Sequence, residues 1–303
     1  MDRMPSKVFC SVAMAAICLS LPGCGAMRTE ATSSELTDTT ANSGVPSAAN
    51  GKGAALLSAF FGLDNGLFQV ANLICNGAAG KDGMPVIFST EIDHRTMQAG
   101  DFKVSTASGK TGTMHCVSLL PATDAGELRT VLLIGEFGNA DSDPPARVEI
   151  VGNLNSIDGA LNFKGAQVAV TPLAPGPTLV MAERVSDREV DKGLGLSRTK
   201  GSACPATSVA QQIRVVWAGG VTLPKGDEPG DAERKQYKVT VTAADGKPRE
   251  IIPIALADLG DGDNNHVLCL DTADKPLSVS FPGGILKDPN GDLNPPTKVT
   301  ILD

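Results

Sequence analysis

Large aromatic side chains are scarce in this chain. Its 303 residues include nine Phe, one Tyr and one Trp, and aromatics make up 4% of the total. Aromatic rings supply much of the buried area in an ordinary core. We therefore expect hydrophobic cores that lack large rings and are assembled from smaller apolar side chains.

Basic clusters and histidine pairs are also missing. Lys and Arg number 26 against 34 Asp and Glu, the formal net charge is −8, and no basic run occurs. Nucleic acid is therefore not an expected partner, because its phosphates are bound by clustered Lys and Arg. His94, His115 and His266 each lack a second His or a Glu at zinc-ligand spacing, which argues against zinc. His266, beside an acidic loop, is the best of the three for a functional role.

Sequence motifs of known catalytic sites are absent too. The chain has no G-x-S-x-G and no phosphate-binding glycine loop. Carboxylate pairs for glycoside hydrolysis stay open, because their pairing is spatial rather than sequential. Asp124 with Glu127 and Asp261 with Asp263 are the candidates, and we expect both pairs to be solvated turn acids. The sequence thus favours a protein without catalytic activity.

The chain does contain an uncharged, mostly apolar run from Val8 to Leu21, directly after Arg3 and Lys7. This run is about as long as a signal-peptide core, and it is shorter than the ~20 residues that a membrane span needs. The sequence therefore predicts export. Cleavage before Cys24 would remove a net charge of +1 and leave a mature chain of about −9.

The segment Leu21-Pro22-Gly23-Cys24 resembles a bacterial lipoprotein signal. The resemblance implies that residues 1–23 are a signal peptide and that Cys24 becomes acylated, palmitate included, which gives a firm anchor. Gly25, where an inner-membrane retention signal has Asp, favours a lipid-anchored protein of the cell outer membrane. An ordinary cleaved secretory signal and an uncleaved anchor are the alternatives, and both export the chain.

Beyond the signal, the composition changes twice. Residues 24–55 are rich in Ser, Thr, Ala, Asn and Gly, so they are expected to form a flexible tether. After them the sequence repeats in order and at nearly constant spacing, which predicts a duplication with domains at 56–172 and 173–303. The matching segments are Phe102–Val104 with Tyr237–Val239, Gly109-Lys110 with Gly246-Lys247, Asp124–Leu132 with Asp258–Leu268, Arg147–Gly152 with Ser278–Gly283, Leu161-Asn162 with Leu293-Asn294, and Val168–Val170 with Val299–Ile301.

Each copy contains about seven short apolar runs, several alternating with period two and separated by Gly, Asp, Asn and Pro. Only Ala54–Phe61 fits a short helix. The pattern predicts an all-β chain of two tandem β-sandwich domains, with a barrel as the alternative; it resembles bacterial immunoglobulin-like repeats, and no family of known activity. The expected strands are Phe68–Ile74, Pro85–Thr90, Phe102–Thr106, Met114–Leu120, Thr130–Phe137, Ala146–Val151, Ala166–Thr171, Thr178–Val185, Gln212–Ala218, Tyr237–Ala243, Ile251–Ala257, His266–Leu270, Leu277–Phe281 and Lys298–Leu302.

The cysteines fit this division. Cys10 and Cys18 leave with the signal and Cys24 takes the lipid, so four of the seven remain in an oxidising compartment. One bridge in each domain predicts the disulfides Cys75–Cys116 and Cys204–Cys269. A thiol metal site or a nucleophilic Cys is the alternative, and both are disfavoured because no C-x-x-C occurs and a free thiol would oxidise in that compartment.

Polar and acidic residues gather in two loops of the second copy. Oxygen side chains at alternate positions, as in the first half of a calcium loop, make one loop a candidate weak calcium site, although Val299 stands where an EF-hand has its Glu. The alternative is that these residues only make hairpin turns. The candidate calcium ligands are Asp288, Asn290, Asp292 and Asn294, helped by Asp261 and Asp263, and the rest of the expected binding loop is Asp258, Asn264, Asn265 and His266.

The sequence leaves three functions open. The favoured one is a lipid-anchored module, without a bound cofactor, that binds a protein or glycan at the cell envelope through these loops. A structural envelope protein with no small ligand and a carboxylate- or metal-dependent hydrolase are the alternatives.

Overall fold

The structure is a computed structural model, and it describes residues 53–185 and 200–302. The predicted signal peptide, the Cys24 acylation site and residues 24–52 of the predicted tether lie outside the described residues. Ala54, near the end of that tether, is buried in the first domain. Within the described ranges, no helix has the length and apolar character that crossing a membrane requires.

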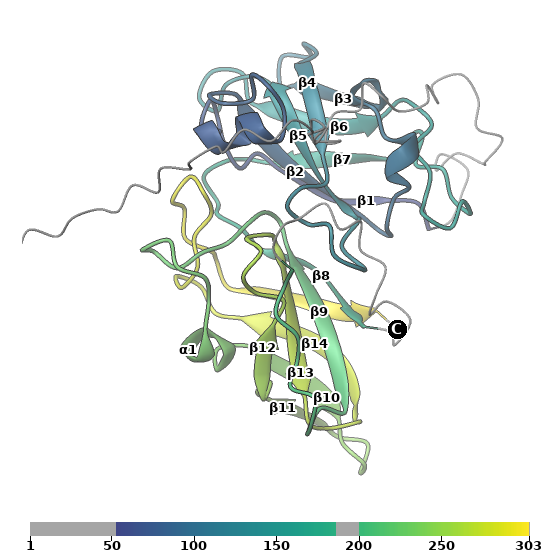
Figure 1. Ribbon diagram of the computed structural model, residues 1–303, viewed down its shortest axis with the longest axis vertical. Helices are drawn as coiled ribbons and strands as arrows, with labels where there is room; N and C mark the ends of the chain where they lie inside the picture. Colours follow the sequence, from purple (N-terminus) through teal and green to yellow (C-terminus); the bar gives the residue numbers. More distant parts are fainter. Residues whose placement is uncertain (1–52, 186–199, 303) are drawn as a thin grey trace, which may run out of the picture.

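The described chain forms two domains, each built on one curled β-sheet, and they are stacked along the long axis of the molecule (Figure 1). The first sheet has the strand order β3-β6-β7-β1-β2-β5-β4. Three short 3-10 helices, η2 (Gln69–Leu73), η3 (His94–Thr96) and η4 (Ala99–Asp101), lie in its connections. Its strands are β1 (Leu56–Phe60), β2 (Asp82–Phe88), β3 (Phe102–Thr106), β4 (Thr113–Ser118), β5 (Thr130–Glu136), β6 (Pro145–Ile150) and β7 (Gln167–Thr171).

The second sheet has the order β11-β10-β14-β15-β8-β9-β13-β12. A single turn of helix, α1 (Asp231–Arg234), precedes its third strand. The strands are β8 (Leu179–Arg184), β9 (Gln211–Trp217), β10 (Lys238–Thr242), β11 (Pro248–Ile251), β12 (Ala255–Ala257), β13 (Asn265–Leu270), β14 (Lys275–Phe281) and β15 (Thr297–Leu302). The change from one sheet to the other falls between Thr171 and Leu179, where the sequence predicts the domain boundary.

The two sheets have the same topology once β11 is set aside. Reading β8 as the counterpart of β1 and continuing in order, the second sheet repeats the strand sequence of the first. Each first strand pairs antiparallel with the second and parallel with the last, and each carries a bulge at the same place, before Ser58 and before Met181. Such detail does not arise from composition, so the predicted all-β fold and duplication are confirmed.

Each domain has its own core. In the first, Phe61, Phe88, Phe102, Phe137 and Phe163 are all buried, and the rings of Phe88 and Phe163 meet edge to face at 4.9 Å. The expectation that the cores lack large rings is therefore wrong. The few aromatics of the chain are concentrated in the cores, because a ring removes more apolar surface from water than any aliphatic side chain.

The core of the second domain is centred on three rings. Trp217, Tyr237 and Phe281 are buried together, with centroids of Trp217 and Phe281 at 5.4 Å and of Tyr237 and Phe281 at 4.5 Å. The one Trp and the one Tyr of the chain are thus both in this domain.

Three predicted elements are wrong. Ala54–Phe61 contains strand β1 rather than a helix, because a central strand that is buried on both faces is apolar along its length. Phe68–Ile74 forms η2 instead of a strand, since β1 already occupies the position between β2 and β7. Ile251–Ala257 splits into β11 and β12 on opposite edges of the sheet, because Pro253 cannot donate a ladder hydrogen bond.

Both disulfides join the predicted partners. Cys75, just after η2, bonds Cys116 on β4, and Cys204, in the loop before β9, bonds Cys269 on β13. The predicted pairing is confirmed, and each bridge lies within one domain. The bridges do not join equivalent strands, since the counterpart of β13 in the first domain is β5.

Candidate functional site

Equivalent faces of the two domains pack against each other. Leu57 and Ile87, on β1 and β2, form one apolar cluster with Val180, Met181 and Val216, on β8 and β9. The strand registers make Leu57 equivalent to Val180, and Ile87 equivalent to Val216. The contact therefore resembles the isologous interface of a two-fold dimer, formed here within one chain.

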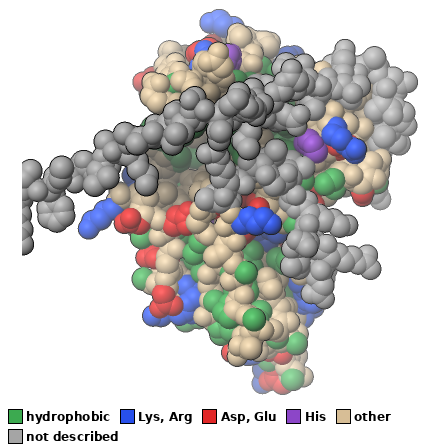
Figure 2. Space-filling view, viewed as in Figure 1, with side chains coloured by type: hydrophobic (Ala, Val, Ile, Leu, Met, Phe, Trp, Pro, Cys, Tyr) green, Lys and Arg blue, Asp and Glu red, His purple; other side chains and the backbone are tan. Residues whose placement is uncertain are grey.

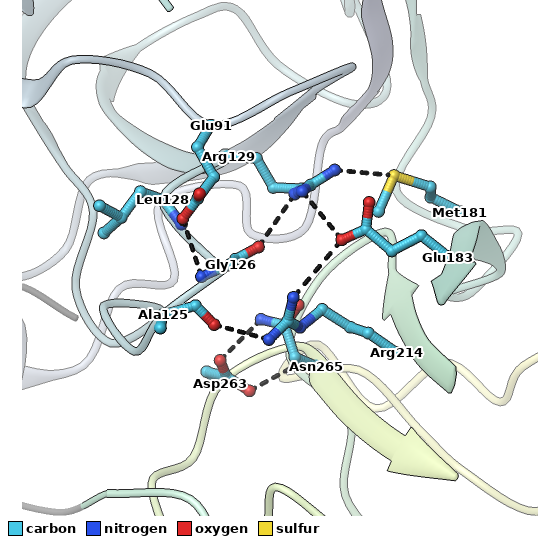
Figure 3. Close-up of polar contacts among 10 residues, drawn as sticks. All are labelled: Glu91, Ala125, Gly126, Leu128, Arg129, Met181, Glu183, Arg214, Asp263 and Asn265. Carbon is cyan, nitrogen blue, oxygen red and sulfur yellow. Dashed lines mark hydrogen bonds and ion pairs between the residues drawn. The ribbon is translucent and has the colours of Figure 1, made fainter. Parts of the chain in front are cut away.

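Beside this apolar cluster, Glu183 joins the two domains through arginines (Figure 3). The Glu183 carboxylate, on β8, lies 2.9 Å from an Arg129 Nη of the first domain and 3.4 Å from an Arg214 Nη on β9. Both guanidinium groups are almost fully buried. Arg129 also donates to the Gly126 carbonyl at 3.1 Å. Removing one partner of such a buried charge pair leaves the other charge uncompensated, which is strongly destabilising.

The Asp124–Glu127 loop, which precedes β5, is the part of the first domain that reaches this network. Arg214 crosses the boundary and donates to the Ala125 carbonyl at 2.6 Å. It lies against Gly126, whose φ is +86°, and a Cβ on Gly126 would overlap its guanidinium. The Gly126 N–H donates to the Glu91 carboxylate at 2.8 Å. A glycine is thus required there for two reasons, its backbone conformation and the close approach of Arg214.

Four carboxylates converge next to this loop. Asp124 and Glu127 of the first domain and Asp258 and Asp261 of the second each place one oxygen within 4.8 Å of the others. Asp258 and Asp261 lie in the loop between β12 and β13, which is the counterpart of the loop between β4 and β5. Asp124-Ala-Gly-Glu127 and Asp258-Leu-Gly-Asp261 therefore carry the same pattern, D-x-G-acid, at equivalent positions of the two domains.

Three of these four carboxyl groups have raised pKa values. Burial and the nearby Asp263 and Asp258 carboxylates raise the pKa of Glu127 far above its usual range. Burial also raises the pKa of Asp258, and burial together with Asp258 raises the pKa of Asp261 to about 6. The expectation that Asp124 and Glu127 form a solvated turn pair is wrong for Glu127, which is 1% exposed. Carboxylates so arranged need a proton or a cation among them.

Two adjoining cavities open at the domain junction. One, of about 200 Å³, is mostly apolar, and Phe60, Leu63, Leu119 and Leu132 are among its lining residues. The other, of about 410 Å³, has five acidic side chains among its lining residues, together with Lys287 and His266. Figure 2 shows acidic side chains at the level where the two domains meet. The residues that line both cavities are Phe68, Gly220, Gly262, Asp263 and Pro289, and the acidic residues of the second are Glu228, Asp258, Asp261, Asp263 and Asp288.

The predicted calcium loop forms a turn. One oxygen of Asp288 accepts the backbone N–H groups of Gly291 and Asp292 at 2.8 and 2.9 Å, and Asn290 donates to Asp292 at 2.6 Å. Asn294 is buried and bonds the backbone of Ile285, Leu286, Pro282 and Pro295. Among the described residues, neither Asp288 nor Asp292 belongs to a cluster of three or more His, Cys, Asp or Glu whose ligand atoms all lie within 4.8 Å of one another. Asp288 does line the acidic cavity, so part of the predicted set faces the junction.

The predicted binding loop does not form an exposed end of the second domain. Asp263, Asn264, Asn265 and His266 are all buried, because β13, which begins at Asn265, lies between β9 and β12. The Asp263 carboxylate accepts both the backbone and side-chain N–H groups of Asn265, each at 2.7 Å. Asp258 and Asp261, earlier in the same loop, meet the first domain and line the acidic cavity, so the expected binding loop lies at the junction.

His266 belongs to a buried chain of hydrogen bonds. Trp217 Nε1 donates to the Tyr237 hydroxyl at 3.0 Å, and that hydroxyl lies 2.7 Å from His266 Nδ1. Burial lowers the pKa of His266 to about 4, so the imidazole is neutral at pH 7. With the Tyr237 hydroxyl donating to Nδ1, the proton of His266 is on Nε2.

A second group with metal-ligand character lies in the first domain, between the end of η2 and β4. Cys75, His115 and Cys116 place ligand atoms within 4.8 Å of one another. The two sulfur atoms are joined in a disulfide, and His115 Nε2 lies 2.8 Å from the Asn76 carbonyl. A disulfide sulfur is not the thiolate that zinc requires, so these residues do not form a zinc site.

The junction has almost no signature in the sequence. Arg129, Glu183 and Arg214 carry no motif, and Glu91 contacts Gly126 across 35 positions of sequence. One signal is present: the match of Asp124–Leu132 with Asp258–Leu268 contains D-x-G-acid in both copies. No protein-family model and no curated protein matches this chain.

Proposed function

We propose that this protein is a lipid-anchored binding module of the bacterial cell envelope, without catalytic activity, and that its binding site is the junction between the two domains. The paired cavities carry this proposal, because an apolar hollow beside an acidic one is the usual make-up of a recognition site. The lipoprotein-like segment ending at Cys24 and the two disulfides support the envelope location.

Exposed apolar side chains extend the site outward. Phe68, Val70 and Leu73, in and before η2, are 59%, 64% and 70% exposed, and Phe68 lines both cavities. The neighbouring Cys75–Cys116 disulfide ties this segment to β4. A contiguous exposed apolar patch rimmed by polar residues is a usual mark of a protein-binding surface.

The chemistry of the site selects the partner. An apolar side chain fits the cavity lined by Phe60 and Leu132, and a basic group beside it would face acidic residues of the second cavity, Glu228 and Asp288. The net charge of −8 favours the same kind of partner. The partner class is therefore an envelope protein that presents an apolar residue next to a Lys or Arg.

Site-specific photocrosslinking in cells tests this function. A photoreactive residue at Val70 should yield one main adduct with an envelope protein, whereas the same residue at Ile252, which is 50% exposed but remote from the cavities, should not. The adduct should be found in the membrane fraction and should be lost from it with Cys24→Ser. Equal labelling from both positions would contradict the site. An adduct of twice the chain mass would instead support the structural role.

The acidic cavity also supports a second candidate, a carboxylate-dependent hydrolase. Asp261, with a pKa raised to about 6 by burial and by Asp258, is the kind of group that acts as a general acid or base. Turnover of a glycoside or ester by the purified chain, abolished in Asp261→Asn and retained in Asp292→Asn, would establish this activity in place of simple binding.

A further inference from the structure

We infer that the duplicated D-x-G-acid loops form an interdomain calcium site, with Asp124, Glu127, Asp258 and Asp261 as ligands. The four side chains come two from each domain, and one oxygen from each lies within 4.8 Å of the others. An ion at their centre would bind both domains at once. Asp258 and Asp261 also line the acidic cavity, but the site is defined by the four carboxylates and not by a ligand of that cavity.

A buried acceptor without an N–H or hydroxyl donor points to a ligand at this place. Glu127 is 1% exposed, and among the described residues no N–H or hydroxyl donates to its Oε1, while the Asp258 carboxyl lies within hydrogen-bond reach of the Glu127 carboxyl. Its other oxygen, Oε2, accepts the Asp124 N–H at 2.8 Å, which turns the carboxylate toward the cluster. Asp258 Oδ2 is also buried and receives no N–H or hydroxyl donor there, so the two carboxyls face each other and need a proton or a cation between them. Buried acceptors are normally satisfied, because an unpaired one costs the full desolvation of the group.

The neighbouring arginines do not offset the charge of the four acids. Arg129 and Arg214 share the Glu183 carboxylate, and both donate to carbonyls of the Asp124–Glu127 loop. They thereby hold the loop in place by its backbone. A cation at the centre would supply the charge that the cluster still needs.

Glycines in the second domain and in both motifs leave room for the carboxylates of the cluster. Gly201 donates its N–H to Asp124 Oδ2 at 3.0 Å, and a Cβ on Gly201 would overlap a carboxylate oxygen of Asp258. Gly126 and Gly260, the third residues of the two motifs, both have positive φ, +86° and +103°. The repeated glycine thus gives both loops the sharp turn that brings their two acids together.

Calcium suits this donor set better than other common ions. All four side chains offer hard carboxylate oxygens, and up to eight oxygens satisfy the coordination number of Ca²⁺. Zinc favours His and Cys ligands, which this cluster lacks, and Mg²⁺ needs a strict octahedron that two independent loops rarely supply. We expect a Kd on the order of 10⁻⁴ M, as in extracellular calcium modules.

Calorimetric titration of the detergent-solubilised full chain with CaCl₂, after EDTA treatment, tests the site. One ion per chain should bind, and Glu127→Gln and Asp258→Asn should each weaken binding at least about tenfold, because each removes a charged ligand. Asp292→Asn, in the turn between β14 and β15, is the matched control and should bind calcium like the wild type. Titration with MgCl₂ should show that Mg²⁺ binds more weakly than Ca²⁺.

Hydrogen exchange supplies an independent reading of the interdomain role. Calcium should slow the exchange of the Gly126, Glu127 and Leu128 amides in the wild type and should leave it unchanged in Glu127→Gln. Far-UV circular dichroism and intact disulfides identify variants that fold, and Asp124→Asn replaces any that does not. The inference is overturned if titration of the wild type with CaCl₂ shows no heat of binding. The acids would then share a proton instead of an ion. It is also overturned if binding is lost in Asp292→Asn and kept in the cluster variants.

Discussion

The two domains share one strand order but differ in what stabilises them. The first has a core of five phenylalanines and a disulfide on β4, and the second has Trp217, Tyr237, Phe281 and a disulfide on β13. Strand order and register are shared down to the bulges before Ser58 and Met181. A change of register would move every side chain to the opposite face, whereas a crosslink or a core ring can be replaced locally.

The same comparison explains where the loops meet. The D-x-G-acid pattern occurs in both copies, at equivalent turns that face each other across the junction. Elsewhere the loops have diverged: Asp158 accepts from Ala160 and Ser156 in the first domain, and Asp288 accepts from Gly291 and Asp292 in the second. The four acids of this shared motif are the ones that meet across the junction.

The disulfides give the largest expected difference from the wild type. Replacing Cys75 and Cys116 by Ser, or Cys204 and Cys269 by Ser, should each cost about 4 kcal/mol, because the closed loops span 41 and 65 positions. The free energy of unfolding in urea measures both. Similar losses would show that a bridge acts mainly on the unfolded chain, wherever it sits in the sheet. A loss confined to one pair would show instead that the two bridges are unequal.

Removal of the Glu183 carboxylate should lower the free energy of unfolding almost as much as loss of a disulfide. Glu183→Gln leaves the buried guanidinium groups of Arg129 and Arg214 without their shared carboxylate, and we expect a loss of about 3 kcal/mol. Glu250→Gln, from the exposed pair with Lys238, is the matched control and should cost less than about 1 kcal/mol. Urea unfolding of both variants provides the test, and equal effects would contradict a stabilising role for the junction network.

A fall in pH should destabilise the second domain through its buried histidine, whereas the first domain has no buried histidine. The pKa of His266 is about 4 in the folded protein and 6.5 is its ordinary value, so the unfolded chain binds more protons between these values. Stability from this group is therefore complete above pH 6.5 and is lost as the pH falls toward 4, by up to about 3 kcal/mol. The two other His residues are not buried, so the first domain has no such contribution from a histidine.

His266→Asn isolates the effect, since its amide oxygen can still accept from Tyr237 and does not titrate. The difference in unfolding free energy between wild type and variant should shrink as the pH falls from 6.5 to 4. A difference that stays constant over that range would contradict a buried neutral His266. His115→Asn, at an exposed position, serves as the control.

Much of this fold follows from local sequence. Period-two alternation locates most strands, because a strand with one buried face must alternate, and the ordered sequence matches indicate the duplication. The cysteine pairing follows from one bridge per domain. Local sequence misleads at Ala54–Phe61 and Phe68–Ile74, where apolar runs have no usable period, and at Pro253, which divides a run that otherwise resembles one strand.

The sequence by itself determined that there are two copies of one β-fold, where most strands lie, and which cysteines pair. Only the tertiary structure decided that Asp124 and Glu127 meet Asp258 and Asp261, and that Glu183 bridges Arg129 and Arg214. Strand pattern and turn residues act over a few neighbours in the chain. The junction joins residues tens to more than a hundred positions apart, and their meeting depends on which faces of the two folded domains pack together.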